Sequence, residues 1–90
     1  MHRPALQENQ FAVGQAELAT GHVLQKDGSL YISGSDITNV YEIFNSYEAA
    51  QEFAITKVIN DPKVECWIIN FLGKTLFVYD TEGERKFKDS

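Results

Sequence analysis

Residues 45–80 read NSYEAAQEFAITKVINDPKVECWIINFLGKTLFVYD, and this stretch decides the fold. Its first four residues are typical of a capping box, in which Asn45 accepts from the backbone N–H three residues on and Glu48 reaches back. A helix is therefore predicted from this point. Because Pro62 disfavours helical geometry at the residue before it, the helix is expected to run to about Asn60.

The remainder of this stretch predicts a β-hairpin. Strands over Val64–Leu72 and Thr75–Asp80 flank Gly73-Lys74, a pair that suits a two-residue turn. That turn pairs Ile69 with Val78, and facing pairs share one side of the sheet. One side then carries Trp67, Ile69, Phe71, Leu76 and Val78, and we expect the helix to cover it. The other side carries Cys66, Ile68, Asn70, Leu72, Thr75, Phe77 and Tyr79.

The upstream residues predict the remaining two or three strands of the sheet. Asp27-Gly28 is a strong hairpin turn signal between residues 22–25 and 30–33, and Thr38–Phe44 is rich in β-branched and aromatic residues. The lead-in over 1–18 is compatible with a short helix or with an edge strand. The polar tail over 81–90 is expected to be frayed.

These elements predict one α+β domain over residues 1–90. Its order is β-β-β-α-β-β, with an antiparallel sheet of four to five strands and one helix packed on one face. No run approaches the roughly 20 apolar residues of a membrane span, so no membrane partner is expected. The net charge of -5 and the pI of about 4.8 argue against nucleic acid as a partner.

The side chains that carry chemistry are few. His22 and Cys66 show no zinc-ligand spacing, and a buried thiol usually behaves as a small apolar group. Gly73-Lys74-Thr75 lacks the preceding glycine of a phosphate loop. We therefore predict no catalytic residue, no metal and no cofactor. A single Cys and the lack of a secretory signal favour the cytoplasm.

The eleven aromatic residues (one Trp, four Tyr and six Phe) exceed what one helix on one sheet can cover. Either residues 5–19 fold over the second sheet face, or that face binds another molecule. Ile55 and Ile59 of the helix also lack cover, and a homodimer would bury them. The candidate interface residues are Tyr31, Tyr41, Glu42, Glu65, Ile68, Phe77 and Tyr79.

The run Tyr41–Ala50, with Phe53-Ala54 and Asn60–Cys66, resembles small uncharacterised bacterial α+β proteins, some of the toxin-immunity type. The resemblance implies a binding role. We therefore expect a non-enzymatic protein-binding module, such as an immunity-type inhibitor, whose acidic surface suits a basic protein partner. The alternatives are a small-ligand domain or minor enzyme with a helix–sheet pocket lined by Trp67, and a homodimeric structural protein.

Overall fold

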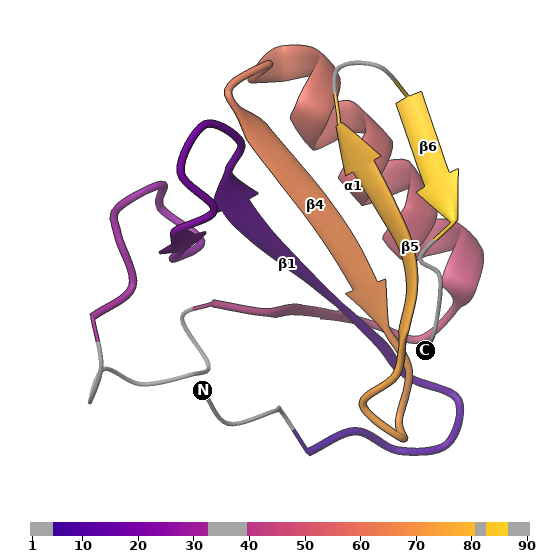
Figure 1. The fold of residues 1–90 in the computed structure, drawn as a ribbon. Coiled ribbons are helices and arrows are strands. Elements are labelled where there is room, and N and C mark those ends of the chain that lie inside the picture. Colours follow the sequence, from indigo (N-terminus) through magenta and orange to yellow (C-terminus); the bar gives the residue numbers. More distant parts are fainter. Residues whose placement is uncertain (1–4, 33–39, 81–82, 87–90) are drawn as a thin grey trace.

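The computed structural model describes residues 5–32, 40–80 and 83–86. It shows an antiparallel sheet with one helix across one face (Figure 1), which confirms the predicted α+β class and element order. The sheet order is β2-β1-β4-β5-β6, and β3 pairs with β1. The elements are β1 (Phe11–Glu17), β2 (Val23–Leu24), β3 (Glu42–Phe44), α1 (Tyr47–Asn60), β4 (Val64–Ile69), β5 (Thr75–Asp80) and β6 (Gly83–Lys86).

Strand β1, from the lead-in that the sequence left open between helix and edge strand, lies inside the sheet. One of its edges pairs with β4, from Ala12 opposite Ile69 to Glu17 opposite Val64. Its other edge is shared, because β3 pairs with residues 11–13 and β2 with residues 15–16. A strand that is buried on both faces suits small side chains, and this one is rich in Ala and Gly.

The predicted hairpin around Asp27-Gly28 forms only in part. The turn is present, with Gly28 at φ 91° and the Gln25 N–H donating to the Ser29 carbonyl at 2.7 Å. The second strand is reduced to one bridge between Leu24 and Leu30. Leu30 and Ile32 are 50% and 69% exposed, so a longer ladder would bury little. Of the strand predicted over Thr38–Phe44, residues 42–44 are β3, whereas 38–39 lie outside the described residues.

The helix spans Tyr47–Asn60, close to the predicted range. Its N-cap is Ser46 rather than Asn45: the Ser46 hydroxyl accepts from the Ala49 N–H at 3.1 Å. Asn45 accepts instead from the Gln10 side chain at 3.3 Å, which ties the lead-in to the helix start. A serine hydroxyl caps as well as an asparagine amide does, so the sequence alone did not separate the two.

The β4–β5 hairpin has a longer turn than predicted, because β4 ends at Ile69. Asn70 organises the turn: its Oδ1 accepts from the Leu72 and Lys74 N–H groups, both at 3.0 Å. The register moves by two residues, so that Trp67 lies opposite Val78 instead of Asp80. An even shift leaves residues 66–68 and 77–79 on their predicted sides of the sheet. A register irregularity between Ile68 and Ile69 then pairs Ile69 with Thr75, which the sequence placed on the other side.

The helix covers the opposite side from the one predicted. Its buried residues Ala50, Ala54 and Val58 are small and lie against a side of the sheet that is rich in large side chains. We call this the helix layer. Its buried core consists of Val13, Leu24, Ala50, Ala54, Val58, Val64, Cys66, Ile68 and Tyr79. Tyr47 and Phe77 border it with ring centroids 5.7 Å apart.

The other face has its own cover, which we call the outer layer. Its buried residues are Ala12, Val40, Tyr41 and Ile69, with Leu6, Val23, Tyr31 and Trp67 packed against them. The Trp67 ring lies so close to Gly14 that a Cβ there would overlap it. The lead-in, through Leu6, therefore covers the Trp67 face, while α1 covers Phe77 and Tyr79.

The tail also departs from the expectation of fraying, because residues 83–86 form β6 and pair with β5. Residues 81–82 and 87–90 lie outside the described part of the chain.

Candidate functional site at the β2–β3 junction

The predicted interface residues do not form one surface. Ile68 and Tyr79 are 0% and 2% exposed beneath α1, and Phe77 is half-buried beside them. Tyr41 is 4% exposed in the outer layer, where Tyr31 also packs. The assignment of the Phe77–Tyr79 face as an exposed surface is therefore wrong. Strand alternation correctly placed Ile68, Phe77 and Tyr79 on one side of the sheet. Both sides of the hairpin are apolar, however, so alternation did not show which side the helix covers.

Of the predicted acids, Glu42 lies at a junction between elements. The shared edge of β1 leaves Gly14 between β3, which pairs up to Val13, and β2, which pairs from Gln15. A cavity of about 30 Å³ lies at this gap. Such a volume holds one or two water molecules. It is lined by Val13, Gly14, Gln15, Lys26, Val40, Glu42 and Phe53, and not by Trp67 as the small-ligand alternative expected.

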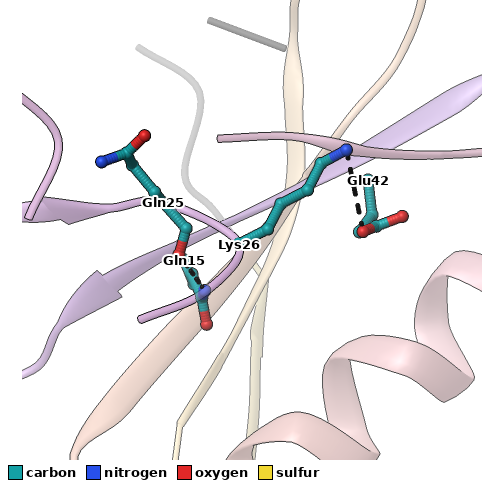
Figure 2. A network of polar contacts seen from close by, with 4 residues as sticks. All are labelled: Gln15, Gln25, Lys26 and Glu42. Atoms are coloured by element: carbon teal, nitrogen blue, oxygen red, sulfur yellow. Dashed lines mark hydrogen bonds and ion pairs between the residues drawn. The ribbon is translucent and has the colours of Figure 1, made fainter. Parts of the chain in front are cut away.

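An ion pair joins the two elements at this gap. The Lys26 Nζ, just after β2, lies 3.8 Å from the Glu42 Oε1 at the start of β3 (Figure 2). Both side chains are 42% exposed. An exposed pair at this distance contributes roughly 0–1 kcal/mol to stability, so another charged group can exchange with either member at little cost.

Beneath the ion pair, the buried Gln15 amide holds the β2 loop. Its Nε2 donates to the Gln25 carbonyl at 2.6 Å (Figure 2), and the side chain is 6% exposed. The Gln15 Oε1 is buried with no hydrogen-bond partner among the described residues. The sequence analysis missed this residue, although a polar side chain amid the small apolar residues of β1 was the available signal.

The loop after β2 is further ordered by Asp27. Its carboxylate accepts from the Ser29 hydroxyl at 2.6 Å and from the Ser29 N–H at 2.9 Å. These hydrogen bonds stabilise the charged form, so they lower the pKa of Asp27. Hydrogen bonds at Gln25 and at Asp27 thus fix the backbone on both sides of Lys26.

Three exposed apolar side chains lie toward one end of the sheet, one on β3 and two in the 70–74 turn. Ile43 pairs with Ala12, and Ala12 pairs with Ile69, the last residue before the 70–74 turn. Ile43, Phe71 and Leu72 are 47%, 43% and 67% exposed. We call Ile43, Phe71 and Leu72 the Ile43–Leu72 surface. Glu42 precedes Ile43 in β3 and pairs with Val13 of the helix layer, so its side chain lies on the other face of the sheet.

The residues considered for chemistry lie elsewhere. Cys66 is 0% exposed in the helix layer, and burial raises the pKa of its thiol to about 12. His22 is exposed in the turn before β2. Within residues 5–32 and 40–80, no three His, Cys, Asp or Glu side chains are grouped so as to hold a metal ion. No helix in the same ranges has the length and apolarity needed to span a membrane.

Comparisons with protein-family models, curated proteins and solved structures found no match to this chain.

Proposed function

We propose that this chain is a non-enzymatic protein-binding module that uses the Ile43–Leu72 surface to bind a basic protein. The observation that carries the proposal is the exposure of Ile43, Phe71 and Leu72 on a chain of net charge -5. Exposed apolar side chains that gather in one place mark contact sites more often than isolated ones do.

The apolar members of the surface would supply the affinity. Leu72 is 67% exposed at the tip of a turn that Asn70 holds rigid through two backbone hydrogen bonds. A preformed turn loses little conformational entropy when it binds. Phe71 beside it offers an aromatic ring, a group that is enriched at the centres of interfaces.

The carboxylate of Glu42, adjacent to Ile43 in β3, would select the partner. A Lys or Arg of the partner can take the place of Lys26 at Glu42, because the existing pair is long and exposed. The acidic net charge would steer a basic partner toward the chain.

An immunity-type inhibitor that blocks a bacterial toxin or effector is the specific form of this proposal. The single cysteine further favours a cytoplasmic setting for it.

The proposal is tested by capture from a lysate of the source organism with the immobilised protein. Wild type and Leu30→Asp should retain the same partner, because Leu30 is also exposed (50%) but lies on the β2 loop. Leu72→Asp and Ile43→Asp should lose it, and Glu42→Lys should weaken capture most at low salt. For the inhibitor form, the captured protein should be toxic when expressed alone and harmless with the wild-type chain.

A partner that Leu72→Asp and Ile43→Asp retain as well as wild type would refute the proposed surface. Capture that does not respond to salt or to Glu42→Lys would refute a basic partner.

A further inference from the structure

The turn after β2 contains a pair of residues whose chemistry the candidate site does not use. Asp27-Gly28 is the one place in the sequence where glycine follows Asp or Asn. Because glycine has no Cβ, its backbone nitrogen can approach the carboxyl group of the preceding aspartate with little steric hindrance. Both residues are exposed, so water reaches them. The turn is therefore a candidate for isomerisation of its own backbone.

Isomerisation at such a pair proceeds in two steps. The Gly28 nitrogen forms a bond to the Asp27 Cγ, and one carboxyl oxygen leaves as water with the carboxyl proton and the amide proton. The product is a succinimide ring. Water then opens the ring at one of its two carbonyl groups. This step gives either aspartate again or isoaspartate, whose main chain runs through the former side chain, and the mass of the chain is unchanged.

Hydrogen bonds in the native turn oppose the first step. The Asp27 Oδ1 accepts from the Ser29 hydroxyl at 2.6 Å and from the Ser29 N–H at 2.9 Å, and both bonds stabilise the charged carboxylate. They therefore lower the pKa of Asp27 and deplete the protonated form that ring closure consumes. The Gly28 N–H donates to the Gln25 carbonyl at 2.9 Å, which holds the proton that the attacking nitrogen must lose.

We propose that Asp27-Gly28 is an isomerisation site and that Ser29 sets its rate. The reaction is slow while Ser29 holds the carboxylate, and it accelerates when the turn opens. A pair that is reactive by its sequence is thus protected by the fold. The inference does not rest on the proposed function, because this turn lies outside the Ile43–Leu72 surface.

The product of the reaction alters the candidate site. Isoaspartate at residue 27 lengthens the main chain by one atom. The Gln25 N–H closes the native turn by donating to the Ser29 carbonyl at 2.7 Å, and the longer chain disturbs this geometry. Because Lys26 lies within the turn, its ion pair with Glu42 then loses its fixed support. The modification therefore loosens the β2–β3 junction.

Incubation of the full chain at neutral pH, followed by proteolysis and separation of the peptides that contain residue 27, measures isoaspartate over time. Wild type should isomerise several-fold more slowly when folded than in concentrated urea. Ser29→Ala removes the hydroxyl donor and should accelerate isomerisation several-fold in the folded chain. The matched control is Thr20→Ala, which removes a hydroxyl that donates to the Glu17 carboxylate at 2.8 Å in another exposed turn. This control should isomerise like wild type.

The pH dependence separates an effect on protonation from a general loosening of the turn. Above the ordinary carboxyl pKa of 3.8, wild type holds less of the protonated form than Ser29→Ala does, so the variant reacts faster. Toward lower pH both carboxyl groups become protonated, so the ratio of the two rates should fall. Circular dichroism confirms that each protein is folded at each pH.

Three outcomes would overturn the inference. The first is a folded wild-type chain that isomerises as fast as the chain in urea. The second is a Thr20→Ala variant that accelerates as much as Ser29→Ala. The third is a ratio of Ser29→Ala to wild-type rates that stays constant as the pH is lowered.

Discussion

The two layers of this protein cover the same sheet in opposite ways. On the helix layer, α1 contributes small side chains such as Ala50 and Ala54, and the strands contribute large ones such as Ile68 and Tyr79. On the outer layer, β1 contributes Ala12 and Gly14, and the bulk comes from Trp67 and from irregular segments such as that of Tyr41.

The difference teaches how one short chain covers both faces. A regular helix approaches a sheet closely only where its own side chains are small, so the strands must then supply the volume. On the outer layer, where no helix is present, the Tyr41 and Trp67 rings meet edge to face at 6.1 Å. We therefore expect the helix layer to respond to lost volume and the outer layer to added volume.

The largest effect is expected in the helix layer. Ile68→Ala removes a fully buried side chain and should lower the free energy of unfolding by roughly 2–5 kcal/mol. Ile43→Ala, at a position that is 47% exposed, is the control and should cost well under that. Urea denaturation measures both. Similar losses for the two variants would show that the helix layer is not the main core.

The pKa of Cys66 reports whether water reaches the interior of the helix layer. Burial raises its pKa from 9.0 to about 12, so between these values the folded chain keeps a proton that the unfolded chain has lost. Stability should therefore fall with rising pH in this window, by at most about 1.4 kcal/mol per pH unit, and should not depend on this thiol below it.

The measurement for Cys66 is urea denaturation of wild type and of Cys66→Ala across this alkaline window. The variant should lack the thiol's share of the slope, whereas tyrosines and lysines contribute equally to both proteins. Parallel pH profiles would show that water reaches the thiol.

Added volume tests the outer layer. Gly14→Ala forces a methyl group into the Trp67 ring and should cost about 1–3 kcal/mol, with a change in the fluorescence of this single tryptophan. Trp67→Leu on the Gly14→Ala background should recover part of that loss, because the ring is gone. A Gly14→Ala variant with wild-type stability and fluorescence would contradict the close approach of Trp67.

The smallest effect is expected at the amide below the ion pair. Gln15→Met should leave stability within about 1 kcal/mol of wild type, since it removes an unpartnered buried oxygen together with one hydrogen bond. The Gln25 carbonyl keeps the Gly28 N–H as a donor at 2.9 Å. Thermal unfolding measures the change. A loss of several kcal/mol would mean that the Gln15 amide is a main support of the β2 loop.

The sequence predicted the features that local chemistry decides. The end of the helix before Pro62, the Asp27-Gly28 turn and the division of residues 66–68 and 77–79 between two faces follow from proline, glycine and strand alternation. Which face the helix covers was not predictable, because both faces of β4 and β5 are apolar and strand alternation treats them equally.

The central position of β1 also escaped prediction, for a physical reason. Ala12, Gly14 and Ala16 carry little of the β-branched and aromatic signal by which strands are recognised, because Trp67 fills the space over Gly14. The candidate site was found only through Glu42. Its neighbours Gln15 and Lys26 come together through the pairing of β1 with β2 and β3, which depends on contacts far apart in the sequence.

The pairing of β1 with β4 sets the order in which this chain can fold. Gly14 lies opposite Trp67, so the middle of the sheet closes only after most of the chain is available. Contacts between residues this far apart in the sequence make sheet formation slow. Until β4 is available, β1 therefore remains unpaired on that edge. The seven residues of β1 include Gly, Gln and Glu. This composition lowers the risk of aggregation while the strand is unpaired, because a more strongly apolar strand would be prone to aggregate.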